Sequence, residues 1–158
     1  MTDAPPPRRK RIRLSPQVYG EMGAICSVTI AVRDRRPVYA EVRAAASAVD
    51  VLRIHALRTG VPIYGYCVMP DHVHIVLGPS VSHDIVTFVG QFKNLAQRAL
   101  WNLGLRGRLW QIGFYDHFLR ADEQVERVVP YVLDNPVRAG LVTSRGDYRF
   151  AGSFVFDL

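Results

Sequence analysis

Short apolar runs rich in β-branched residues alternate along the chain with longer segments whose apolar positions recur at helical spacing. Residues 24–32, 61–69 and 72–77 have the first pattern, which predicts three strands. The second and third runs are so close in the chain that we expect them to pair as an antiparallel hairpin. Residues 109–119 are aromatic and alternating, which predicts a fourth strand.

Two segments with helical spacing separate these strands. Residues 40–59 are rich in alanine and predict a helix that Gly60 ends. The second helix is expected to be capped by Ser82, to carry Asp84 in its first turn and to end at Gly104. Its apolar stripe comprises Ile85, Phe88, Val89, Phe92, Leu95, Ala96, Ala99 and Leu103.

A third helix is predicted over residues 122–135, followed by a short tail. The resulting order is β-α-β-β-α-β with an extra C-terminal helix, which is the ferredoxin-like arrangement of the α+β class. Such an antiparallel sheet carries two helices on one face, so the other face is free for a site near the extra helix. The 158 residues suit one domain, predicted over 16–158 and preceded by a flexible arm over 1–15.

The composition, with 49% hydrophobic and 22% charged residues, is that of a globular protein. A formal net charge of +6 favours an anionic partner, with nucleic acid as the first candidate. Within the arm, Arg8, Arg9, Lys10 and Arg11 are candidate DNA contacts, although a basic tail can equally serve solubility alone.

The cysteines and the hydropathy of the sequence bear on the expected cellular location of the protein. Cys26 and Cys67 lie in apolar, strand-like runs and are expected to be reduced core residues. No apolar run approaches the roughly 18 residues of a membrane span, and no signal-peptide core follows the basic residues. We therefore expect a soluble cytoplasmic protein with no membrane partner.

His72 and His74 stand two residues apart in the third predicted strand, directly after a Pro-Asp turn. Because a strand alternates its faces, both imidazoles should point the same way. Two neighbouring nitrogen ligands suit a metal site, whereas a buried apolar face would leave their polar atoms without partners. Two surface histidines on a half-exposed strand are the alternative interpretation.

Tyr131 and Asn135 are four residues apart in the last predicted helix and should share one of its faces. The amide oxygen of Asn135 can coordinate a metal, and the Tyr131 hydroxyl can act as a nucleophile. The alternative is a core tyrosine beside a helix-ending Asn-Pro. Pro130 leaves the direction of Tyr131 open, because either a helix begins there or the axis bends.

These motifs occur in a fixed order: MPDHVH at 69–74, WQ at 110–111, FYDHFLR at 114–120 and YVLDNPVRAGLV at 131–142. In this ordered set the chain resembles the single-tyrosine HUH transposases, and most of all the REP-associated tyrosine transposases. The resemblance runs from about the first strand to Val142.

The resemblance implies a metal-dependent endonuclease and strand transferase that acts on single-stranded DNA near hairpins. The paired histidines of the family match His72 and His74, its third metal ligand matches Asn135, and its nucleophile matches Tyr131. It further implies Mg or Mn as cofactor, a covalent 5′-phosphotyrosine intermediate and a homodimer.

Other residues are candidates for DNA contacts. Arg120, Arg127 and Arg138 flank the tyrosine helix, and Lys93 lies on the polar face of the long helix. Tyr115 is a second possible nucleophile, but its aromatic neighbours favour packing or base stacking. Asp116 and His117 alternate faces, so only one can meet the site; His117 could bind a phosphate. Trp110 is expected in the core, and His55 and His83 at the surface.

Two other functions fit the same pattern. A non-catalytic nucleic-acid-binding module of the same fold would stack bases on Tyr64, Tyr66 and Tyr115. A zinc hydrolase would act through metal-bound water, with Asp71 or Asp116 as its only evident general base.

Overall fold

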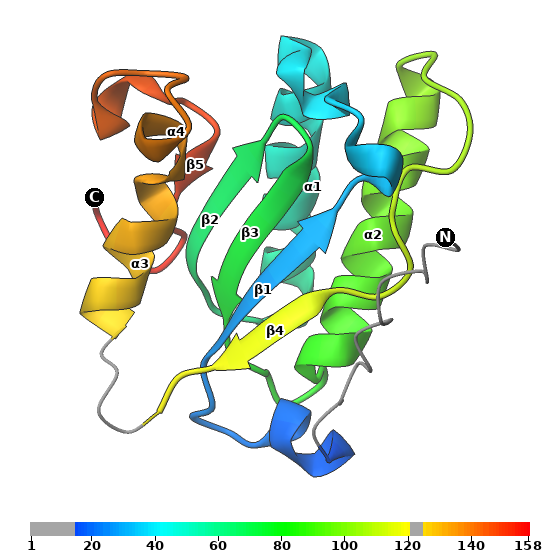
Figure 1. Cartoon of the computed structure of the whole chain (residues 1–158). Helices are drawn as coiled ribbons and strands as arrows, with labels where there is room; N and C mark the ends of the chain where they lie inside the picture. The colour runs from blue at the N-terminus through cyan, green and yellow to red at the C-terminus, as the bar shows by residue number, and fades with distance from the viewer. Residues whose placement is uncertain (1–14, 121–124) are drawn as a thin grey trace, which may run out of the picture.

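The computed structural model describes residues 15–120 and 125–158. Its centre is an antiparallel sheet of five strands in the order β4-β1-β3-β2-β5 (Figure 1). The strands are β1 (Cys26–Ala31), β2 (Ile63–Met69), β3 (His72–Leu77), β4 (Tyr115–Phe118) and β5 (Ala151–Gly152). The first four have the ferredoxin-like order, which confirms the predicted α+β fold and its hairpin between β2 and β3.

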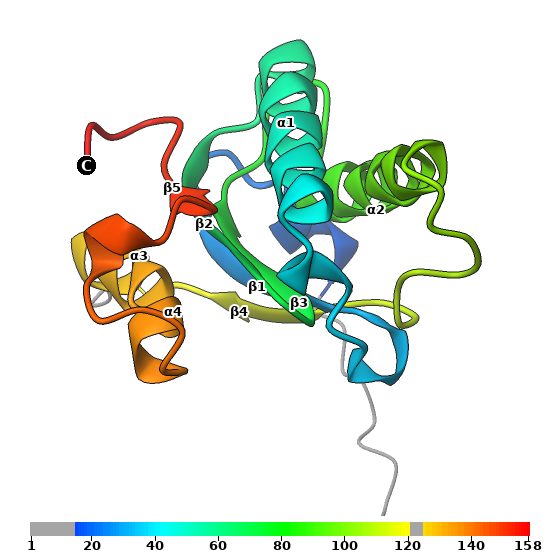
Figure 2. The same cartoon turned by 90° about the horizontal axis from the view of Figure 1, so that it is seen from above.

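Helices α1 (Val42–Thr59) and α2 (Ile85–Asn102) cover one face of the sheet (Figure 2). Between them and the sheet lies the main core, in which the largest fully buried side chains include Phe88, Phe92 and Leu52. Gly60 ends α1 in the left-handed conformation, as predicted. The capping residue of α2 is Asp84, not Ser82, because Asp84 directly precedes the first helical turn and accepts a 2.7 Å hydrogen bond from the Thr87 N–H.

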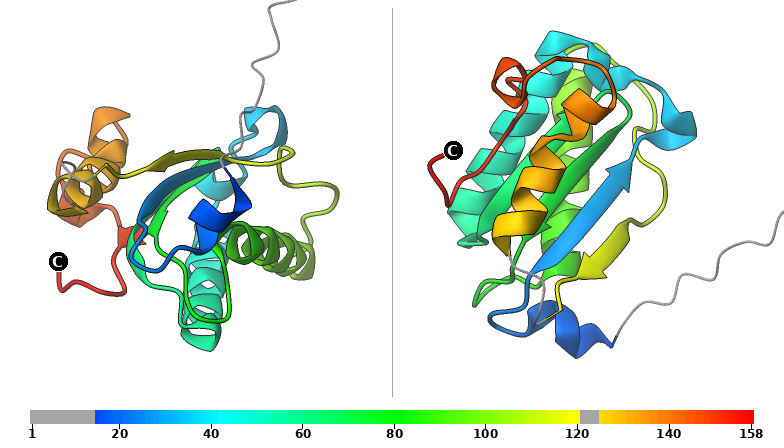
Figure 3. Two further views of the ribbon diagram at one scale, coloured as in Figure 1. Left: turned by 90° about the horizontal axis from the view of Figure 1, so that it is seen from below. Right: turned by 60° about the vertical axis from the view of Figure 1, so that its left-hand side comes forward.

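Helices α3 (Val125–Leu133) and α4 (Asn135–Arg138) lie on the opposite side of the sheet (Figure 2). In the right-hand view of Figure 3, α3 crosses in front of the sheet and α1 lies behind it. A second, smaller core joins the two layers, formed by Cys67, Met69, Val76, Val129, Val132 and Leu133. The C-terminal helix therefore lies on the face that the two long helices leave uncovered, as the sequence predicted.

Pro130 lies inside α3, so the helix does not begin there. The Asp134 N–H donates to the Pro130 carbonyl at 2.9 Å, and the Arg138 N–H donates to the Asp134 carbonyl at 3.0 Å. Helical hydrogen bonding thus runs from α3 into α4 through the single turn residue Asp134. The first residues of the predicted helix, 122–124, and the basic arm with Arg8, Arg9, Lys10 and Arg11 lie outside the described residues.

Two predictions about strands need correction. The fourth strand is only Tyr115–Phe118, because Gly113 adopts a positive φ of 72° and only an isolated Val32–Trp110 bridge precedes it. The C-terminal residues are more than a tail, since β5 pairs with the outer edge of β2. A strand of two residues is too short to produce a hydrophobic alternation in the sequence. The remaining helical elements are short 3-10 turns at Pro16–Gly20, Arg33–Arg35, Val38–Ala40 and Arg145–Asp147.

Three predicted environments can be compared with the structure. Cys26 and Cys67 are free and buried, and burial raises the pKa of each thiol to about 12. Trp110 is in the core, as predicted. His55 is not at the surface: it is buried between the two long helices, with its ring stacked 4.4 Å from the Phe88 ring. In the part of the chain that the structure describes, no helix is long and apolar enough to cross a membrane.

Candidate active site

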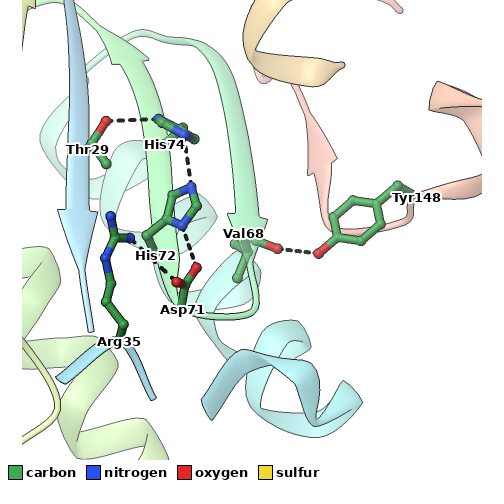
Figure 4. Close-up of polar contacts among 7 residues, drawn as sticks. All are labelled: Thr29, Arg35, Val68, Asp71, His72, His74 and Tyr148. Atoms are coloured by element: carbon green, nitrogen blue, oxygen red, sulfur yellow. Dashed lines mark hydrogen bonds and ion pairs between the residues drawn. The ribbon is translucent and has the colours of Figure 1, made fainter. Parts of the chain in front are cut away.

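His72 and His74 point from β3 to the face on which α3 lies. Their neighbours Val73 and Ile75 are fully buried in the main core on the other face, which fixes the alternation of the strand. The two Nε2 atoms lie 3.0 Å apart and share a hydrogen bond, in which His74 is the donor if His72 carries its proton on Nδ1 (Figure 4). The sequence prediction that both imidazoles share one face is therefore confirmed, and the rings also converge on one point.

Each ring is held by a hydrogen bond at its other nitrogen. Asp71 Oδ1 lies 2.6 Å from His72 Nδ1, and Thr29 Oγ1 lies 2.9 Å from His74 Nδ1 (Figure 4). Because a carboxylate only accepts, His72 carries its proton on Nδ1 and a neutral ring presents a lone pair on Nε2. Thr29 reaches His74 because the two residues are paired across β1 and β3. Such outer hydrogen bonds orient metal-binding histidines.

The electrostatic environment keeps His74 neutral. Burial, together with the nearby His72, Arg138 and Arg35, lowers the pKa of His74 to about 4, against an opposing effect of Asp71. Arg35 also lies 3.6 Å from the Asp71 carboxylate (Figure 4). At neutral pH His74 is thus in the form that can coordinate a metal.

The spacing of the two imidazoles fits a divalent ion. Two ligand atoms that each lie about 2.1 Å from one ion, at right angles, are about 3.0 Å apart. Within residues 15–120 and 125–158 there is no group of three or more His, Cys, Asp and Glu side chains suited to a metal. Among the described residues, a third protein ligand would therefore be of another type, such as an amide oxygen.

Tyr131 and Asn135 are joined by one guanidinium. Arg138 donates to the Asn135 Oδ1 at 2.8 Å and to the Tyr131 carbonyl at 2.7 Å, and its Cζ lies 3.8 Å from the centroid of the Tyr131 ring. The Tyr131 side chain is 65% exposed, whereas its neighbours Val129 and Val132 are buried against the sheet. Because Val129 and Val132 pack on Cys67 and Val76, the helix that carries Tyr131 lies on the side of the sheet to which the histidines point.

The position of α3 is fixed by its neighbours. Gly65 of β2 leaves room for Val129, and the Asp134 carboxylate takes two 2.8 Å hydrogen bonds from the Arg145 guanidinium. Farther along, the Tyr148 hydroxyl donates to the Val68 carbonyl at 2.6 Å (Figure 4). The C-terminal segment, from Arg145 to β5, thus ties the tyrosine helix to the edge of the sheet.

Comparison with known proteins places this site in a family. Residues 24–135 match the family model described as "Transposase IS200 like", which includes both histidines, Tyr131 and Asn135. The chain belongs to the IS200-like transposase family.

Individual relatives agree with this assignment. A REP-associated tyrosine transposase of Escherichia coli (strain K12) is 26% identical over 89 residues, 56% of this chain. The match spans 52% of that relative, about half its length. A solved structure of a REP-associated tyrosine transposase bound to a REP hairpin has a TM-score of 0.69 at 23% identity and covers 84% of this chain and 78% of its own. A candidate transposase of Deinococcus radiodurans R1 has a TM-score of 0.54 at 24% identity, over 73% and 93% of the two chains.

In this IS200-like protein, strand β4 brings two further predicted site residues to the sheet face on which His72 and His74 lie. Tyr115 pairs with Thr29, so Tyr115, Thr29 and His74 form a row across three strands. His117 lies on that face too, whereas Asp116 lies on the other and accepts a 2.6 Å hydrogen bond from the Tyr19 hydroxyl. Asp116 is therefore excluded as a general base at the histidines.

The predicted cations lie in different settings. Lys93 of α2 donates to the carbonyls of Gln111 and Gly113 at 2.8 and 2.9 Å, so it holds the segment before β4. Arg120 and Arg127 are exposed, at the end of the first described segment and on α3 respectively. Phosphate contacts by Lys93, Arg120 and Arg127 remain predictions.

The aromatic residues of the alternative binding module are not arranged as it requires. Tyr66 is buried in the main core, with its ring 4.8 Å from the Phe154 ring, so its predicted role in base stacking is wrong. Tyr64 is half-buried beside Phe156. Tyr115 is 53% exposed on the histidine face and is the one of the three that remains suited to stacking.

Several residues that shape the site were not predicted for these roles. Asp71 could have been identified from its position next to His72, whereas Thr29 and Gly65 depend on strand register and helix placement. The bidentate bond of Arg145 links positions 11 residues apart across the turn after α4. No local sequence signal marks such a pair.

Proposed function

We propose that this protein is a metal-dependent transposase that nicks and rejoins single-stranded DNA with Tyr131 as its nucleophile. The observation that carries the proposal is the pair of Nε2 atoms 3.0 Å apart, on the sheet face that the tyrosine helix covers. Family membership supports the same activity.

His72, His74 and Asn135 are the residues that would hold the ion, for which we propose Mg or Mn. When bound, a divalent ion withdraws charge from a phosphate oxygen and makes the phosphorus more electrophilic. Asp71 and Thr29 fix the ring orientations, and the low pKa of His74 keeps that imidazole unprotonated.

Tyr131 then carries the covalent chemistry. Its phenolic oxygen forms a bond to phosphorus while the bond from phosphorus to the 3′-oxygen breaks. The phenol loses a proton, the 3′-oxygen gains one, and the 5′-phosphate remains on the tyrosine. Attack by another 3′-hydroxyl reverses the step and rejoins DNA, because the energy of the phosphodiester is kept in the tyrosine link.

The substrate we propose is single-stranded DNA beside a hairpin. A relative of the same fold is described as bound to a REP hairpin, and the net charge of +6 suits a polyanion. Tyr115 would stack a base; Arg120, Arg127, Arg138, Lys93, His117 and the basic arm would contact phosphates. A homodimer in the cytoplasm is the proposed working form.

The decisive experiment traps the covalent adduct. The full chain is incubated with labelled hairpin oligonucleotides with single-stranded flanks and Mn²⁺ or Mg²⁺, and denaturing gels are read for labelled protein. The adduct should form with wild type and Tyr115→Phe and be absent with Tyr131→Phe or with chelator. An adduct that persists in Tyr131→Phe excludes this nucleophile.

A second function, a non-catalytic nucleic-acid-binding module, is favoured by one observation. Asn135 Oδ1 is engaged by Arg138, so in this conformation the two histidines are the proposed ligands that remain available. Oligonucleotide binding without metal, unchanged in His72→Ala/His74→Ala and without any adduct, would establish the module instead.

A further inference from the structure

Arg138 contacts both Asn135 and Tyr131, the two residues of this region that the proposed reaction needs. Its guanidinium takes up the amide oxygen of Asn135, binds the carbonyl of Tyr131 and covers the ring of Tyr131. We infer that Arg138 is a latch that DNA phosphate opens: when a phosphate takes the guanidinium, Asn135 becomes available as third metal ligand and the tyrosine ring is uncovered. This inference rests on the proposed function, because it assigns a positioning role within the same site.

Arg138 makes no direct contact with a negative charge: the nearby Asp134 carboxylate, whose pKa its charge helps to lower, is hydrogen-bonded to Arg145 instead. The three contacts of Arg138 are a carbonyl oxygen, an amide oxygen and an aromatic face, none of which carries a negative charge. Among residues 15–120 and 125–158, no carboxylate makes an ion pair with it. The side chain is exposed on α4, so a phosphate can reach it from solvent.

A phosphate is a better partner than these neutral acceptors. A phosphate carries the opposite charge to the guanidinium and often accepts two hydrogen bonds from it, whereas the oxygens of Asn135 and Tyr131 are uncharged acceptors. A DNA phosphate at Arg138 would therefore replace the bond to Asn135 Oδ1 at a net gain. The released amide oxygen lies on the same helical turn as the guanidinium, so no refolding of α3 or α4 is required.

The consequence is a coupling between DNA and metal. In the free protein the ion competes with Arg138 for Asn135, so metal binding is weakened until DNA is present. By linkage, a metal that takes Asn135 also frees the guanidinium for phosphate, so each ligand strengthens the other by the same factor. The complete site would then form only on its substrate.

The alternative is that Arg138 is only a strut that stabilises the junction of α3 and α4. A double-mutant cycle on Mn²⁺ affinity, measured on the full chain without DNA, separates the two roles. Arg138→Ala should bind Mn²⁺ roughly tenfold more tightly than wild type, because the lost bond to a charged donor no longer competes for the amide. In an Asn135→Ala background, the same change should give a much smaller gain.

Two controls separate the latch from a change of side-chain volume and from a simple loss of surface charge. Arg138→Gln removes the charge with a smaller change of volume and should reproduce the gain. Arg149→Ala removes another surface cation, one that stacks on Phe150, and should leave the Mn²⁺ affinity unchanged. A gain for Arg138→Ala that is equal with and without Asn135 overturns the latch, as does no gain at all.

A metal-free measurement tests the opening step. With chelator present, oligothymidylate is added to isotope-labelled protein, and the side-chain NMR signals of Arg138, Asn135 and Tyr131 are followed. All three should shift together in wild type, and the Asn135 and Tyr131 shifts should be lost in Arg138→Ala. Bound oligonucleotide that leaves the Asn135 amide signal in place overturns the latch.

The same titrations separate this inference from the proposed function. His72→Ala/His74→Ala should abolish the specific Mn²⁺ binding of the wild-type chain. Unchanged binding in that variant refutes the proposed metal site itself. A metal site that depends on the histidines, but whose affinity does not respond to Arg138, refutes the latch alone.

Discussion

Val129 of α3 packs directly over Gly65 of β2, where a Cβ added to the glycine would lie 3.1 Å from Val129 Cγ1. The absence of a side chain at Gly65 therefore sets how closely the tyrosine helix approaches the sheet. Because His72 and His74 point to the same face from the neighbouring strand, this contact also sets how far the tyrosine helix lies from the histidine face.

Gly65→Ala should displace α3 and destabilise the protein by about 1 kcal/mol, since extra volume in a packed contact costs roughly 1–3 kcal/mol. Urea unfolding measures this loss. Gly65→Ala/Val129→Ala should cost less than the sum of the two single changes, because the second removes the methyl groups that the first would strike.

Gly90 is a matched control, for which the same substitution should change the stability in the opposite direction. Gly90 lies inside α2, is exposed, and has no neighbour within 4 Å of an added Cβ. Gly90→Ala should stabilise the protein by about 0.5–1 kcal/mol through helix propensity. If Gly65→Ala lowers the stability equally with and without Val129→Ala, this contact does not limit how closely α3 approaches the sheet.

Asp71 is expected to govern metal affinity through His72. The 2.6 Å contact from its Oδ1 to His72 Nδ1 fixes the tautomer that exposes Nε2. Removing such an outer partner typically costs about 10–100-fold in metal affinity, so Asp71→Ala should weaken Mn²⁺ binding by that factor. Isothermal titration of the full chain measures it.

The control is Asp50→Ala, which removes a carboxylate paired with Arg53 on α1. Equal weakening in both variants would mean that net charge, and not the orientation of His72, controls affinity. Thr29→Val tests the second ring in the same way, because it deletes the hydroxyl 2.9 Å from His74 Nδ1. Thr29→Val should lower the Mn²⁺ affinity, and Thr29→Ser, which keeps the hydroxyl, should retain it.

The Asp134–Arg145 pair should contribute modestly to stability and in a pH-dependent way. The two 2.8 Å hydrogen bonds from Arg145 hold the pKa of Asp134 below its ordinary value, against an opposing effect of burial and with help from the charges of Arg145 and Arg138. A carboxyl whose pKa is lower when folded stabilises above its unfolded pKa, and this contribution is lost as pH falls through the folded value. The side chains are largely exposed, so the contribution should not exceed about 1 kcal/mol.

Thermal unfolding of wild type, Asp134→Asn and Arg145→Gln tests this expectation. The two variants should unfold at lower temperature than wild type near neutral pH. The gap between wild type and Asp134→Asn should close well below the ordinary Asp pKa of about 3.9. A gap that persists there would point to the amide substitution itself and not to the ion pair.

Periodicity in the sequence was sufficient to predict the central fold and the face of the histidines. β3 places Val73 and Ile75 in the core, which forces His72 and His74 to the other face. The alternation also limited Asp116 and His117 to opposite faces, but only the pairing with β1 showed that His117 lies on the face of the histidines. Register between strands is not encoded within any single strand.

Other features depend on contacts between distant segments. Thr29 reaches His74 across 45 positions, and Tyr148 reaches Val68 across 80. β5 has only two residues, and its pairing with β2 depends on the path of the whole C-terminal segment. The contact of Arg138 with Asn135 is local, yet it is a choice among side-chain rotamers that composition and spacing do not determine.

His55 illustrates a surface prediction that was wrong, and it provides a pH test. The residue is 6% exposed, and its ring stacks on Phe88 with Nε2 3.3 Å from the Phe88 carbonyl. Burial lowers the pKa of His55, and the nearby His83 and Arg58 act in the same direction, against a smaller effect of the Phe88 carbonyl. The folded protein therefore takes up a proton at His55 less readily than the unfolded chain does.

The sign of the effect follows directly. The pKa of His55 is lower in the folded protein. The contribution of neutral His55 to the free energy of unfolding is therefore fully present above the unfolded pKa of about 6.5, and it falls as the pH drops below that value. His55→Phe keeps an aromatic ring on Phe88 but removes the titration. The free energy of unfolding of wild type minus that of His55→Phe should therefore decrease on acidification, by at most about 1.4 kcal/mol per pH unit.

Urea unfolding of both proteins between pH 8 and pH 5, in steps, measures this difference, and the titration of His74 cancels because both proteins retain it. His55→Gln is polar but does not titrate. The difference in free energy of unfolding between wild type and His55→Gln should therefore change with pH as it does for His55→Phe, although its absolute size differs. If the difference is constant with pH for both substitutions, protonation of His55 does not limit the stability of the fold in acid, and its burial between α1 and α2 matters for packing alone.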